Sequence, residues 1–191
     1  MVSVFTQLPY EVAVKGRKYR LTPAFDNVLK MYKAIDGLDE WDKPEVMMYY
    51  LLKHPPKPSI DVLNAVSKVL FPPSRGGGEK AFAFVEDSPL IYAEFMQAYH
   101  IDLFQEQGKL HWWKFSALLS SLPSNTRFSE ILTIRTKPIP APTKFNKDER
   151  DELMRLKRLY AVKLTSKERE EQLQKSLRSV VNYLASAAKG N

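Results

Sequence analysis

The residues best suited to acid–base or metal chemistry are few in this sequence and widely spaced. The three histidines are His54, His100 and His111, and no two of them have the spacing of a helical metal-binding motif such as HExxH. Asp102 and Glu106 lie four residues apart, which is a common spacing for surface carboxylates. No serine lies in the GxSxG pattern of a hydrolase. These patterns predict no catalytic residue, no metal site and no enzyme activity.

The glycine-rich segment SRGGGEK, residues 74–80, is the clearest predicted loop and holds three of the seven glycines. A phosphate-binding P-loop needs two glycines five residues apart, followed by Lys and then Ser or Thr at the start of a helix. Here Ala81 follows Lys80, and Pro72-Pro73 precedes the loop. We therefore expect an exposed, flexible connection that binds no nucleotide and no other cofactor.

The chain contains no cysteine, which excludes disulfides, thiolate nucleophiles and zinc sites with cysteine ligands. A reducing compartment is the natural expectation. The N-terminal sequence MVSVFTQLPYEVAVKG lacks the basic start and long apolar run of a signal peptide. No apolar stretch approaches the ~20 residues that span a bilayer. We expect a soluble protein that stays where it is made.

Hydrophobic periodicity predicts an all-α fold with about eight helices and a small N-terminal β-hairpin. Alternation at residues 10–21 indicates a hairpin that turns at Lys15-Gly16 and must pack on another element. The expected helices cover residues 24–35, 44–53, 60–70, 88–101, 109–121, 127–135, 146–161 and 166–188.

Several of these helices have predicted caps. Thr22-Pro23 and Ser88-Pro89 each combine an N-cap residue with a proline in the first turn. Asn146 with Glu149, and Thr165 with Glu168, have the spacing of a capping box. Asp151 and Arg155 form a favourable i, i+4 pair.

The predicted organisation has three segments. Residues 1–73 hold the hairpin and the first helices, residues 74–136 follow the glycine loop, and residues 137–191 begin with the proline-rich KPIPAPTK. The net charge of +7 is uneven, because residues 1–143 hold 17 basic and 15 acidic residues whereas residues 144–191 hold 12 and 7. The basic end favours either nucleic acid or an acidic partner, or else two solvated helical faces with surplus lysine.

The sequence LHWWKF, residues 110–115, is the densest aromatic feature. On a helix Trp112 and Trp113 point about 100° apart. We expect Trp112 to pack in the core with Tyr92, Phe95 and Phe115. Trp113 then lies at a boundary, where it is a candidate partner-binding residue.

The C-terminal helix carries a narrow heptad stripe of four aliphatic residues. The proline-rich segment separates this helix from the body, so we predict that the stripe binds a partner or a second copy. The alternative is a helix that folds back and covers the body. The stripe consists of Leu173, Leu177, Val180 and Leu184.

The segment from Glu86 to Arg135 resembles the gene-product-15 family of bacteriophage proteins, found among the tail genes of long-tailed phages. The similarity starts with D-x-x-x-IY-x-x-F-x-x-x-Y-x-IDL from Asp87 to Leu103, continues with LHWWKF-x-x-L, and ends with F-x-x-I-x-x-x-R from Phe128 to Arg135. The chain departs from the family pattern at His100, where glycine is expected. The long basic C-terminal helix is a second departure.

The resemblance implies a tail-assembly chaperone. Such proteins act between the major tail protein and the tape measure protein, and they keep the tape measure soluble in the host cytoplasm until tail protein polymerises around it. They are absent from the finished virion. Two other functions stay open: a nucleic-acid-binding phage protein, and a minor structural tail or connector protein. The first lacks a recognisable DNA-reading motif.

Overall fold

The computed structural model describes residue 5, residues 7–71 and residues 83–162. Within these residues it has seven helices and one two-stranded hairpin, which confirms the predicted mainly α fold with a small N-terminal β-hairpin. The predicted eighth helix and the glycine-rich loop lie outside the described residues. No helix in the described part is long and apolar enough to cross a membrane.

The hairpin forms where the alternating sequence predicts it. Strands β1 (Glu11–Val14) and β2 (Arg17–Arg20) pair antiparallel, with Val14 opposite Arg17. Lys15 and Gly16 both have positive φ, 48° and 79°, as a tight turn matching the strand twist requires. The hairpin packs against α3 (Ile60–Leu70), and Val12 enters the core.

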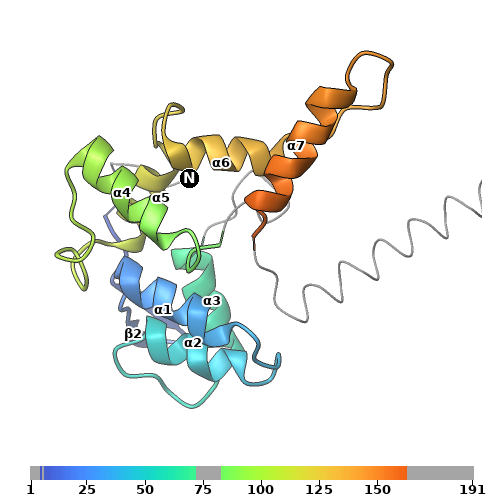
Figure 1. Ribbon diagram of the computed structural model, residues 1–191. Coiled ribbons are helices and arrows are strands. Elements are labelled where there is room, and N and C mark those ends of the chain that lie inside the picture. Colours follow the sequence, from blue (N-terminus) through green and yellow to red (C-terminus); the bar gives the residue numbers. More distant parts are fainter. Residues whose placement is uncertain (1–4, 6, 72–82, 163–191) are drawn as a thin grey trace, which may run out of the picture.

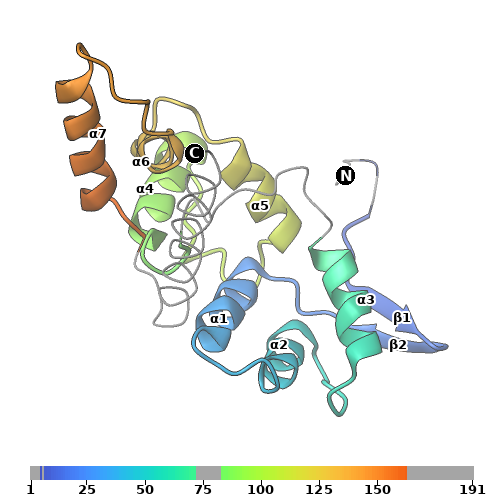
Figure 2. The same ribbon diagram turned by 90° about the vertical axis from the view of Figure 1, so that its right-hand side faces the viewer.

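The helices form two groups (Figures 1 and 2). The hairpin, α3, α1 (Phe25–Ile35) and α2 (Lys43–Leu51) lie together in the lower part of both views. The upper part contains α4 (Ser88–Tyr99), α5 (Trp112–Ser120) and α6 (Arg127–Thr136). Helix α7 (Lys147–Leu159) packs on α6 at the side of the body away from α5.

A short extended segment joins the two groups. The Phe25 N–H donates to the Leu110 carbonyl at 2.9 Å, and the Trp112 N–H donates to the Pro23 carbonyl at 2.7 Å. They flank an isolated antiparallel bridge between Ala24 and His111, whose backbone is extended, so α5 begins at Trp112 and not at Lys109 as predicted. Thr22 does not cap α1 as predicted, because Ala24 holds the N-cap position and the Thr22 hydroxyl donates to the Tyr50 carbonyl at 2.6 Å.

Other predicted caps are replaced by loop contacts. Asn146 is the N-cap residue of α7, but its side-chain amide bonds to Ala141 and Thr143 and makes no capping bond. Ser88 lies one residue inside α4, because Asp87 holds the N-cap position. Arg155 pairs with Glu152 at 2.7 Å, so the predicted i, i+4 pair with Asp151 is wrong.

The core centres on Phe115, which is fully buried. Its ring stacks on Phe25 at 4.9 Å, on Phe95 at 5.1 Å and on Trp112 at 5.6 Å between centroids. The prediction is therefore right for Phe95, Trp112 and Phe115. Tyr92 lies at the edge of this core, where it packs on the exposed Phe104 at 4.9 Å.

Replacing Phe115 with alanine should lower the free energy of unfolding by about 3–5 kcal/mol, because a ring packed on three aromatic neighbours leaves a cavity. Denaturant titration followed by circular dichroism measures this loss. Phe145, which is 98% exposed, provides the matched control, and its alanine variant should change stability by less than ~0.5 kcal/mol. Equal effects at both positions would contradict the assigned core.

Helix α4 ends in a tight cap although glycine is absent. His100 has φ 54° and ψ 33°, in the left-handed region. Its N–H donates to the Met96 carbonyl, which is the bond of the αL capping motif, and the Ile101 N–H donates to the Phe95 carbonyl. The histidine thus adopts the backbone conformation for which the family pattern has glycine.

Replacing His100 with glycine should raise the free energy of unfolding by roughly 0.5–1 kcal/mol, because glycine removes the Cβ clash of the left-handed conformation. His100→Ala is the control, since alanine loses the imidazole but keeps the clash. Thermal melts of both variants distinguish the cause. A similar gain from alanine would mean that the imidazole, and not the backbone, limits stability.

Candidate partner-binding surfaces

The described surface has two apolar hollows, one on each side of Phe84. The first hollow, about 320 Å³, lies between α5 and α6 and is lined by Phe84, Trp112, Ser116, Leu119, Ser120, Leu122, Phe128, Ser129 and Leu132. The second hollow, about 350 Å³, lies between α1, α4 and the loop before α5. It is lined by Phe25, Leu29, Phe84, Ser88, Pro89, Ile91, Tyr92, Leu103, Phe104, Gln107 and Phe115.

The aromatic core forms the inner wall of both hollows. Phe84 lies 5.8 Å from Trp112 and 6.5 Å from Phe115 between centroids, and Trp112 faces the first hollow while Phe115 faces the second. Because these rings are held by stacking, the hollows are built into the fold. Their chemistry suits apolar side chains, since hydrocarbon dominates both linings.

The two tryptophans are placed differently. Trp112 is buried at 8% exposure, as predicted, and also lines the first hollow. Trp113 is half-buried, and its indole N–H donates to the Leu70 carbonyl at the end of α3, at 3.2 Å. This bond fixes Trp113 but does not test its predicted role, which stays a prediction. Leu173, Leu177, Val180 and Leu184 lie outside the described residues.

A buried ion pair holds α4, α6 and α7 together. The Arg135 guanidinium donates two hydrogen bonds to Asp87, at 2.6 and 2.9 Å, and its Nε donates to the Tyr160 carbonyl at 2.5 Å. Asp87 is only 3% exposed. These two residues are the first and last of the matching motifs, and the sequence patterns did not predict that they pair. The spacing within a sequence does not show which distant charges meet.

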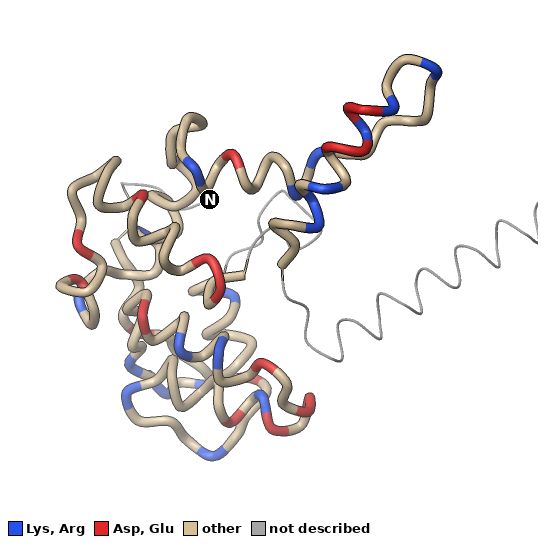
Figure 3. Tube along the Cα trace, viewed as in Figure 1, with Lys and Arg blue, Asp and Glu red and all other residues tan. Residues whose placement is uncertain are grey.

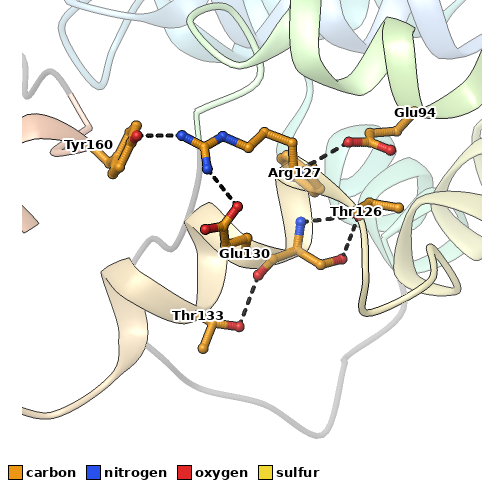
Figure 4. A network of polar contacts seen from close by, with 8 residues as sticks. Glu94, Thr126, Arg127, Glu130, Thr133 and Tyr160 are labelled. Atoms are coloured by element: carbon orange, nitrogen blue, oxygen red, sulfur yellow. Dashed lines mark hydrogen bonds and ion pairs between the residues drawn. The ribbon is translucent and has the colours of Figure 1, made fainter. Parts of the chain in front are cut away.

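A second polar network fixes the start of α6 (Figure 4). Thr126 caps the helix by accepting from the Ser129 N–H, and buried Glu94 of α4 accepts from the Phe128 N–H at 3.2 Å. Arg127 binds Glu130 and the Tyr160 hydroxyl, which again connects α6 to the end of α7. Helix α6, which forms one wall of the first hollow, is therefore held at its start by this network and at its end by the Asp87–Arg135 pair.

A third hollow has a different, basic character. This basic groove, about 260 Å³, is lined by Tyr10, Arg20, Leu21, Thr22, Pro23, Ala24, Asn27, Lys53, Gly108, Lys109 and His111. Three exposed cations surround it, and no carboxylate is among its lining residues. Two described carboxylates adjoin lining residues along the chain: Asp26 accepts from the Gly108 N–H at 2.8 Å and from Lys30 at 2.7 Å, and Glu11 pairs with Lys18 at 3.7 Å.

His111 forms the floor of the basic groove. Its Nδ1 accepts the Trp113 N–H at 3.0 Å and thereby caps α5, so the proton lies on Nε2, which donates to the Pro9 carbonyl at 3.2 Å. Burial lowers the pKa of His111; the Pro9 carbonyl opposes this shift, and Lys114 adds to it. Only the neutral imidazole can make both bonds.

The free energy of unfolding should fall as the pH drops below about 6.5. His111 then takes up a proton in the unfolded chain, whereas its lowered pKa keeps it neutral in the folded chain. Thermal melts between pH 8 and 5 measure the slope. His111→Asn keeps a capping acceptor but does not titrate, so its slope should be flatter. His54→Asn, at an exposed position, should leave the slope unchanged. A slope unaffected by His111→Asn would contradict this assignment.

The described residues contain no group of three or more His, Asp or Glu side chains arranged to hold a metal ion.

Among known proteins, the model of one family, described as Bacteriophage Gp15 protein, matches residues 57–162, which is more than half of the chain. The match covers α3 to α7 and includes both apolar hollows except for the residues of α1. No curated protein and no solved structure matches the chain.

Proposed function

Because the chain belongs to the bacteriophage Gp15 protein family, we propose that it is a tail-assembly chaperone that binds the tape measure protein. The observation that carries this proposal is the pair of apolar hollows beside Phe84. Each hollow accepts apolar side chains, and the two share a wall, so together they suit successive residues on one face of a helix.

The physical requirement for such a chaperone is simple. A tape measure protein presents long apolar helical faces, which aggregate when exposed to water. A helical binder covers these faces in the host cytoplasm, and the major tail protein later displaces it, so that it is absent from the finished virion. Displacement requires moderate affinity for each copy, with many copies acting together. Two hollows of this size are consistent with moderate affinity.

The role of the C-terminal stripe remains a prediction within this proposal. Leu173, Leu177, Val180 and Leu184 offer a second apolar surface for the same helical partner, or for a second copy. Trp113 stays a candidate partner-binding residue. No catalytic activity is part of the proposed function.

Co-expression with the tape measure protein from the same phage tests the proposal, with co-purification as the measurement. Phe104→Ala and Leu119→Ser change the second and first hollows, and we expect each to reduce the recovered tape measure about tenfold or more. Phe104 is 69% exposed, so its loss should leave the fold intact, as circular dichroism would show. Phe145→Ala is the matched control, because this exposed ring lines neither hollow.

Full recovery of the tape measure with both hollow variants would mean that the hollows are not the binding surface. Failure of the unmodified chain to co-purify would reject the chaperone function itself. Presence of the protein in purified virions would instead favour the structural tail or connector role. Steeply salt-dependent DNA binding would favour the nucleic-acid-binding role.

A further inference from the structure

The connection between α1 and α2 presents an exposed tryptophan among carboxylates. Trp41 is 92% exposed, although tryptophan is normally largely buried. Four exposed acidic residues surround it in the sequence: Asp36, Asp39, Glu40 and Asp42. Lys43 binds Glu40 at 2.7 Å and is the only basic residue between positions 36 and 43. This acidic turn, residues 36–42, therefore combines one large aromatic anchor with a local negative charge.

The basic groove has the complementary chemistry. Arg20, Lys53 and Lys109 provide positive charge around it, while Tyr10, Leu21 and Pro23 provide apolar surface. An indole ring in such a groove would gain apolar contact and cation–π attraction, and neighbouring carboxylates would offset the three cations. Within the described part of the chain, no carboxylate lines the groove to offset these three cations.

The two surfaces lie at opposite ends of α1. The groove includes Pro23, Ala24 and Asn27 at the start of the helix, and the acidic turn begins immediately after its last residue, Ile35. An α-helix of this length extends about 16 Å. In Figure 3 the acidic residues of the turn gather at the lower right, beyond the end of α1. One copy therefore cannot place its own turn in its own groove.

We propose that the acidic turn of one copy docks in the basic groove of a second copy, with Trp41 as the anchor. The contact is head-to-tail, so the assembly keeps a free groove at one end and a free turn at the other, and further copies can add. Long anionic polymers fit the groove less well. Outside the basic C-terminal region the chain is nearly balanced, with 17 basic and 15 acidic residues in positions 1–143, whereas a site for nucleic acid usually lies in a strongly basic domain.

Sedimentation of the full chain over a range of concentrations at low salt tests this contact. We expect a series of growing assemblies that weakens with added salt. Trp41→Ala should weaken association about thirtyfold, the effect expected of an anchor residue. Tyr49→Ala is the matched control, because Tyr49 is 68% exposed on α2 but lies in neither surface.

A mixing experiment distinguishes a head-to-tail contact from a symmetric one. A turn variant carries Trp41→Ala with Asp42→Lys, and a groove variant carries Lys53→Glu with Lys109→Glu. All four substituted positions are exposed, so both variants should fold. Each variant alone should be monomeric, but their mixture should form dimers and nothing larger, because only one intact turn and one intact groove remain to pair.

A chain that stays monomeric up to about 1 mM at low salt would overturn the proposal. So would undiminished association of the turn variant, or a mixture that contains no dimers. These measurements need no tape measure protein. A negative result would therefore leave the proposed chaperone function standing, and loss of that function would leave the head-to-tail contact standing.

Discussion

The stacking of three aromatic rings on Phe115 is the constraint on which the rest of the structure depends. It brings α1, α4 and α5 to one point through Phe25, Phe95 and Trp112. The backbone bonds between residues 23–25 and 110–112 then fix how the two groups of helices are oriented. Since flat rings pack in few orientations, this centre is rigid. The two apolar hollows inherit that rigidity because the same rings form their inner walls.

The Asp87–Arg135 pair has a different role. A buried ion pair adds little net stability, since both charges lose their hydration, but an unpaired partner would be strongly unfavourable. The pair therefore favours the one arrangement in which the start of α4 meets the end of α6. Arg135 also binds the Tyr160 carbonyl, and Lys157 binds the Arg135 carbonyl. Helix α7, with only Leu153 fully buried, is thus positioned mainly by polar contacts at its end.

Patterns within ten to fifteen residues predicted much of the fold. Alternation located the hairpin, and helical periodicity located all seven described helices, because each signal depends on a residue and its near neighbours. Caps were predicted less well. Thr22 and Asn146 have the right residue type, but tertiary and loop contacts take their side chains. The hollows could not be predicted, because Phe25 and Phe84 meet the Trp112 and Phe115 rings of α5 only through packing between distant segments. The prominent Trp113 drew attention to the helix, yet its neighbour Trp112 lines the first hollow.

The two proposed contacts have complementary physical properties. The hollows are apolar, so binding to them depends little on salt, whereas the contact between turn and groove is largely electrostatic and weakens with salt. Copies joined head-to-tail would present their hollows at regular intervals, which raises the effective concentration of each hollow along an extended partner. Every single contact can nevertheless be weak. A competitor that removes copies one at a time then faces only one small barrier per step, and a weakly held coat can be replaced without first being released as a whole.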